Sequence, residues 1–106
     1  MSAYRSSASP CKKGDTLHVG LLTVNTSDVP TNADATPTVT AYLGADLAGK
    51  TNPITAFTVT AVTGESGAYD ITRVTTDLTA GTVIHLLVAY LISTAARRQF
   101  IDVLIA

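Results

Sequence analysis

The stretch that decides the fold begins Thr38-Val-Thr-Ala-Tyr-Leu43, continues as Ile54-Thr-Ala-Phe-Thr-Val-Thr-Ala-Val62 and ends Ala68-Tyr-Asp-Ile-Thr-Arg-Val74. In each segment polar and apolar residues alternate. Because successive side chains of a strand point to opposite faces, each segment has one apolar face and one face rich in Thr. The pattern predicts strands throughout the region from Thr38 to Ile105, with no helix among them.

Three further strands are predicted at Thr16 to Val24, Thr82 to Ile92 and Arg97 to Ile105. The second of these is apolar on both faces over most of its length, which is typical of a strand in mid-sheet. Short strands separated by turn signals every 8–12 residues or so indicate a two-sheet sandwich. We therefore predict an all-β fold, an antiparallel immunoglobulin-like β-sandwich of about six to eight strands, with a small closed barrel as the alternative.

Alternation also predicts which side chains face the core. The inward-facing set of the three central segments is Val39, Ala41, Leu43, Phe57, Val59, Ala61, Tyr69 and Ile71. Tyr42 falls on the polar face of its strand, so we expect it to be an aromatic contact residue.

The composition is typical of one soluble domain, and its charge does not indicate binding to a polyanion. The chain has 106 residues, 46% of them apolar, and its formal net charge is −1. A charge so close to zero gives no argument for nucleic acid or an anionic membrane as partner. The longest apolar run, Val83 to Ile92, is about half the ~20 residues of a membrane-spanning helix.

Residues 1–15 are predicted to form an extended N-terminal arm, followed by the sandwich domain at residues 16–106. The arm is polar, rich in Ser and interrupted by Pro10 and Gly14. Its own domain, a neighbouring copy or a larger assembly would have to hold it in place. Cys11 is the only cysteine, so no disulfide forms within the chain, and we interpret it as an inert thiol.

Gly44-Ala-Asp-Leu-Ala-Gly-Lys-Thr51 fits the phosphate-loop pattern of nucleotide hydrolases. That loop binds phosphate only where it opens a helix, whose free N–H groups complete the anion site. Here Asn52 and Pro53 follow, and then the alternating strand pattern from Ile54. We therefore interpret the segment as a flexible loop with a solvated Lys50.

No catalytic residue, cofactor or metal site is predicted. His18 and His85 fall within strands, and a transition metal would need three or four clustered ligands. We expect a buried, hydrogen-bonded His85 and an exposed or subunit-facing His18. Asp28 and Asp34, in the long loop from Asn25 to Pro37, are either calcium ligands or, as we prefer, turn caps.

The second half of the chain resembles a known class of domains. The pattern is Ser66-Gly-Ala-Tyr-Asp-Ile-Thr72, Leu78-Thr-Ala-Gly-Thr-Val-Ile-His-Leu-Leu-Val-Ala-Tyr90 and Phe100-Ile-Asp-Val103, preceded by Asp34-Ala-Thr-Pro-Thr-Val-Thr-Ala-Tyr42. It resembles the immunoglobulin-like accessory domains of tailed-phage virions. Many of those have Gly in the last turn, where this chain has Ser93-Thr-Ala-Ala96.

The resemblance implies a non-enzymatic virion protein, assembled in the host cytoplasm, that decorates and cements a capsid. The expected partner is the major capsid protein or another virion protein, with a homo-oligomer such as a trimer possible. The alternatives are a tail, baseplate or fibre module that recognises a glycan or receptor, and a hydrolase built on the Gly44 loop. The expected contact residues are Tyr4, Arg5, Lys12, Lys13, Asp28, Asp34, Tyr42, Arg97 and Arg98.

Overall fold

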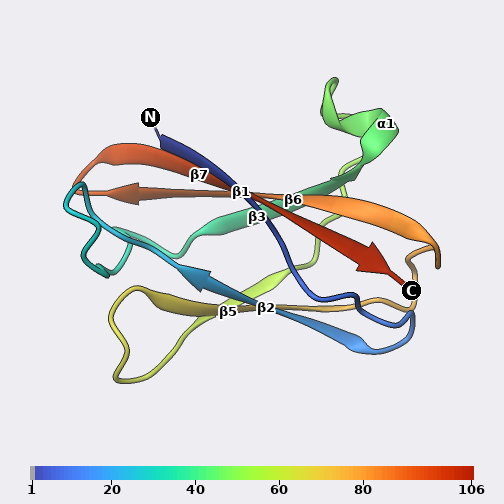
Figure 1. The fold of residues 1–106 in the computed structure, drawn as a ribbon, viewed down its shortest axis with the longest axis horizontal. Helices are drawn as coiled ribbons and strands as arrows, with labels where there is room; N and C mark the ends of the chain where they lie inside the picture. The colour runs from blue at the N-terminus through green and yellow to red at the C-terminus, as the bar shows by residue number, and fades with distance from the viewer. Residues whose placement is uncertain (1) are drawn as a thin grey trace.

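Two β-sheets face each other across an apolar core in the computed structural model (Figure 1), which describes the backbone of residues 2–106 and the side chains of residues 8–106. The elements are β1 (Ser2–Ser7), β2 (Thr16–Leu22), β3 (Thr38–Leu43), α1 (Gly44–Leu47), β4 (Thr58–Ala61), β5 (Ala68–Val74), β6 (Thr82–Ile92) and β7 (Ala95–Ile105). One sheet has the order β1-β7-β6-β3 and the other β2-β5-β4. The predicted all-β sandwich is confirmed.

The β6–β7 hairpin forms the centre of the four-stranded sheet. Its register runs without interruption from Thr82 opposite Ile105 to Ile92 opposite Ala95. Alternate side chains of β6, including Ile84, Leu86 and Val88, are fully buried. The prediction that this strand lies in mid-sheet is confirmed, since β7 and β3 flank it.

The three-stranded sheet supplies the opposite half of the core. In β2 every second residue is buried, and these are Leu17, Val19 and Leu21. Tyr69 and Ile71 of β5 are buried as predicted, and the bounds of β5 agree with the prediction. Apolar side chains from both sheets therefore meet in one cluster, as in a two-layer sandwich.

The N-terminal arm is held by its own domain. Backbone pairing is parallel between β1 and β7, from Ser2 opposite Arg97 to Ser7 opposite Asp102. The association continues beyond the strand, because Cys11 N donates to Leu104 O and Lys13 N donates to Ala106 O. The arm is extended, as predicted, and adds an edge strand to the four-stranded sheet.

The strand predicted at Ile54 to Val62 is reduced to β4, Thr58–Ala61. Ile54 instead pairs with Ala41 of the opposite sheet, and Ala56 has a φ of 71°. Because this φ lies outside the extended region, the chain changes direction there and crosses from one sheet to the other. Ala61, predicted to face the core, is exposed.

The prediction that no helix interrupts the strands is wrong at one place. After β3 the chain makes a single helical turn, α1, within the glycine-containing motif. Leu43 is both the last residue of β3 and the N-cap position of this turn, and its side chain is exposed although it was predicted to be buried.

Candidate functional site

One face of the four-stranded sheet points away from the core and carries apolar side chains interspersed with a few polar and charged ones; we call it the outer face. On β6 and β7 it carries the residues that alternate with the buried ones. Val83, Leu91 and Leu104 are exposed, and Leu87 and Phe100 are half-buried opposite one another. We call these five side chains the apolar band.

A histidine–aspartate pair interrupts the apolar band, between the Val83–Leu104 and Leu87–Phe100 pairs. His85 Nδ1 is 2.6 Å from Asp102 Oδ1, and the two side chains are 14% and 21% exposed. An ionised carboxylate only accepts hydrogen bonds, so the Nδ1–H of His85 donates to it. The prediction of a hydrogen-bonded His85 is confirmed, and its side chain is largely buried.

Tyr42 lies opposite His85 on the neighbouring strand. It is on the outer face, as predicted, but only 7% exposed, so it is not the exposed contact residue that we expected. The chain covers this part of the sheet with the start of α1: a Cβ at Gly44 would lie 3.6 Å from His85 Nε2. Figure 1 shows α1 above this side of the four-stranded sheet.

At the end of the outer face near the β6–β7 turn, the surface is hollowed into a groove of about 340 Å³. Strands β6 and β7 line it with Ala89, Leu91, Ala96 and Arg98, and the preceding loop adds Ala35 and Thr36. Arg98 is half-buried, and no carboxylate among residues 8–106 forms an ion pair with it. We call this hollow the Leu91 groove.

Asp34 fastens the long loop to the same end of the sheet. Its carboxylate accepts hydrogen bonds from Ser93 N at 2.9 Å and Thr94 N at 2.8 Å. Its own amide donates to Leu91 O at 2.8 Å. The interpretation of Asp34 as a turn cap is confirmed.

Among the described residues there is no group of three or more His, Cys, Asp or Glu that could hold a metal ion.

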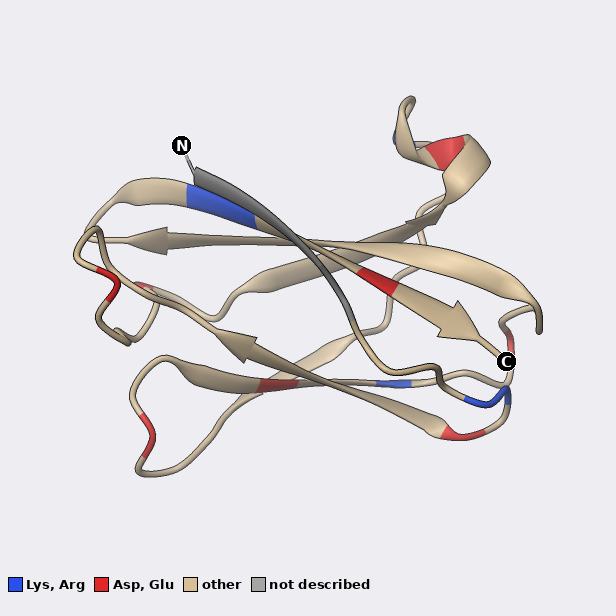
Figure 2. Ribbon diagram, viewed as in Figure 1, with Lys and Arg blue, Asp and Glu red and all other residues tan. Residues whose placement is uncertain are grey.

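The remaining predicted contact residues are dispersed. Arg97 and Arg98 lie at the start of β7, whereas Lys12 and Lys13 lie beside its end (Figure 2). Arg97 points to the inner side of the sheet and is 7% exposed. We expected Arg97 to be a solvated residue at a strand end. It is buried instead, because the alternation of β7 turns it to the same side of the sheet as Tyr90, the buried residue opposite it on β6. Tyr4 and Arg5 have side chains outside the described residues.

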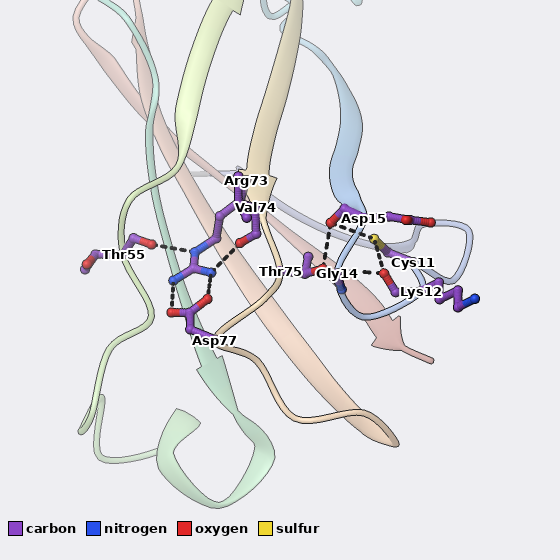
Figure 3. Close-up of polar contacts among 9 residues, drawn as sticks. All are labelled: Cys11, Lys12, Gly14, Asp15, Thr55, Arg73, Val74, Thr75 and Asp77. Carbon is purple, nitrogen blue, oxygen red and sulfur yellow. Dashed lines mark hydrogen bonds and ion pairs between the residues drawn. The ribbon is translucent and has the colours of Figure 1, made fainter.

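An ion pair between the buried Arg73 side chain and the exposed Asp77 side chain was missed by the sequence analysis. Arg73 lies on the inner side of β5 and binds Asp77 through two hydrogen bonds of 2.7 and 3.0 Å (Figure 3). Its Nε donates to Thr55 O, and its guanidinium lies 5.6 Å from the centre of the Phe57 ring. The alternation of β5 places Arg73 on the same face as Tyr69 and Ile71, and this position could have predicted that the Arg73 side chain is buried. Arg73 therefore joins the end of β5 both to Asp77 and to residues 54–57, where the chain crosses between the sheets, and we interpret its role as structural.

The phosphate-loop pattern lacks its helix. After Thr51 the described chain continues as an irregular segment that includes the bridge from Ile54 to Ala41. Inside the motif, the Thr51 hydroxyl donates to Asp46 Oδ1 at 3.1 Å.

His18, predicted to be exposed or subunit-facing, is exposed and contacts Asp70 at 3.4 Å.

No family model, no curated protein and no solved structure matches this chain. Among the described residues, no helix combines the length and the apolar character needed to cross a membrane.

Proposed function

We propose that this chain is a non-enzymatic structural protein that docks onto a larger assembly through the outer face of its four-stranded sheet. The observation that carries the proposal is the apolar band. Five apolar side chains of β6 and β7 lie on the side of the sheet opposite to the core, and three of them are exposed. Exposed apolar side chains gathered on one face mark interaction sites in soluble proteins.

We infer further that the sandwich is of immunoglobulin type. In constant-type immunoglobulin domains one sheet contains strands B, E and D and the other C, F and G. The order β2-β5-β4 against β7-β6-β3 agrees with this arrangement, with β1 added beside β7. The β7-β6-β3 sheet then carries the docking face.

The assembly that we propose is a phage head, which the chain decorates and stabilises by contact with the major capsid protein. The support is the sequence resemblance together with an exposed apolar face that suits docking by burial of area. The contact residues in this proposal belong to the outer face, including Arg98 of β7. Tyr4, Arg5, Lys12 and Lys13 remain proposed contacts of the arm, beside β7.

The test is co-sedimentation of the protein with candidate capsids, using two variants matched in chemistry. Val83→Asp places a charge in the apolar band, where Val83 is 41% exposed. Val74→Asp is the control, because Val74 is 55% exposed on the other sheet. We expect Val83→Asp to abolish binding to the particle and Val74→Asp to retain it.

Equal binding by both variants would remove the outer face from the proposal. Failure of the unmodified protein to bind any capsid, together with binding to a glycan array, would favour the tail or fibre module instead.

A further inference from the structure

The Leu91 groove combines an apolar surface with a cation, Arg98, that forms no ion pair within the described part of the chain. Ala89, Leu91 and Ala96 line it, and Arg98 lies half-buried beside them. None of the carboxylates described in the structure pairs with Arg98. A matching ligand therefore presents an apolar side chain next to a carboxylate, since a cation at the edge of an apolar groove favours an acidic partner.

The chain itself displays such a pair at the tip of its long loop. Val29 is 52% exposed, and Asp28 directly precedes it. The Asp28 carboxylate forms no ion pair with any described cation. Among residues 8–106, the loop tip therefore places an exposed apolar side chain beside an acid without an ion pair.

The tip is held in one conformation by hydrogen bonds within the loop. Asn25 Oδ1 accepts from Ser27 N at 2.8 Å and from Val29 N at 3.1 Å. Asn25 N donates to Val29 O, and Asp28 N donates to Asn25 O. A segment that is already ordered loses little conformational freedom on binding, so this turn is well suited to insertion.

We propose that two copies of this chain associate, with Val29 of each copy in the Leu91 groove of the other and Asp28 paired with Arg98. We choose the loop tip of a second copy as the occupant of the groove because Asp28 and Arg98 have opposite charges and each lies next to an apolar side chain. The proposal goes beyond the proposed function, because it names one neighbour and the contact and requires no larger particle.

The positions of the two patches favour a closed dimer. The loop that carries Asp28 and Val29 also supplies Ala35 and Thr36 to the groove. Asp34, between these parts, binds the β6–β7 turn. Because the loop that carries Val29 also forms one wall of the Leu91 groove, each copy can present both its loop tip and its groove to the other, and a two-fold axis allows both contacts to form at once.

The test is sedimentation equilibrium of the full chain over a range of concentrations, with reversal and exchange of the two charges. We expect Arg98→Asp and Asp28→Arg each to weaken self-association at least about tenfold, because each places like charges together. The double variant Asp28→Arg with Arg98→Asp restores the pair in the opposite sense, so we expect it to recover most of the association.

Lys50→Glu and Glu65→Lys are the controls, since both residues are exposed and neither side chain forms an ion pair among the described residues. We expect both to associate like the unmodified chain. Val29→Ser tests the apolar half of the contact and should also weaken association.

An unmodified chain that stays monomeric at millimolar concentration would overturn the proposal. A double variant that associates no better than the single variants would also overturn it. Restoring the opposite charges should restore association if the single variants fail because the charges repel each other, but not if they fail because they misfold. Capsid binding by a monomer would leave the proposed function intact while removing this inference. A dimer that binds no capsid would support this inference and contradict the proposed function.

Discussion

Asp34 Oδ2 accepts a hydrogen bond from Thr94 N at 2.8 Å, which joins residues 60 positions apart in the chain. The same carboxylate binds Ser93 N. Ser93 and Thr94 have φ values of 48° and 66°, in the left-handed region that usually favours Gly or Asn. Asp34 therefore stabilises a two-residue turn that lacks glycine, and it ties the long loop to that turn.

We expect Asp34→Ala to lower the free energy of unfolding by about 1–2 kcal/mol, since two hydrogen bonds to an exposed carboxylate are lost. Asp34→Asn keeps one acceptor oxygen and should lose less. Urea denaturation followed by fluorescence or circular dichroism measures both variants. A Ser93→Gly change in the Asp34→Ala background should recover part of the loss, and failure to do so would contradict this account of the turn.

Gly67 illustrates a second long-range constraint, because its φ is +77° and a Cβ there would lie 2.5 Å from Thr23 O. We expect Gly67→Ala to cost more than about 3 kcal/mol, the sum of left-handed strain and steric overlap. Gly64→Ala is a matched control, with φ +81° and no atom within 4 Å of the added Cβ. It should cost about 1–2 kcal/mol.

Chemical denaturation of the two alanine variants gives the comparison directly. Equal losses at Gly64 and Gly67 would show that strain alone matters and that the contact with the Thr23 carbonyl does not.

Much of the sandwich follows from the sequence, because alternation over several residues is a strong signal. Thr38 to Leu43, Ala68 to Val74 and Thr82 to Ile92 are strands with the predicted bounds. Alternation does not reveal where a strand changes sheet, so the crossing at Ile54 to Phe57 was interpreted as strand. Nor does it reveal which outward face remains uncovered.

The candidate site was less predictable for the same reason. The apolar character of both faces of β6 correctly predicted a strand in mid-sheet, but a third layer over its outer face is absent among the described residues. Tyr42 was expected to be exposed, since its strand alone does not show that α1 returns over it. Arg98 was named from its charge, whereas the groove beside it is formed by segments distant in sequence.

Removal of residues 1–7 should convert β7 into an edge strand. The structure pairs β1 with β7 over six residues, so the deletion leaves backbone groups of β7 without their partners. We expect a lower urea midpoint and increased aggregation by light scattering, because long exposed edges recruit other strands. An unchanged midpoint would indicate that the arm contributes nothing to the sandwich.

Acid should weaken the fold in part through Asp77. The hydrogen bond from the Arg73 guanidinium holds the pKa of this carboxyl below its usual value of 3.8. A carboxyl with a folded-state pKa below that of the unfolded chain stabilises the fold fully above the unfolded value and loses that contribution as pH falls through the folded value. The stabilisation from this pair is therefore complete near neutral pH and declines below about pH 4.

Asp77→Asn removes the charge and keeps the size of the side chain. We expect this variant to be less stable than the unmodified protein at pH 7 and to differ from it less at pH 2.5, with the gap also narrowing in high salt. Thermal unfolding of both proteins from pH 7 to pH 2.5 measures the gap, and Asp46→Asn, in α1, provides the control. A gap between the unmodified protein and Asp77→Asn that stays constant over this range would show that the Arg73–Asp77 ion pair does not contribute to the acid sensitivity of the fold.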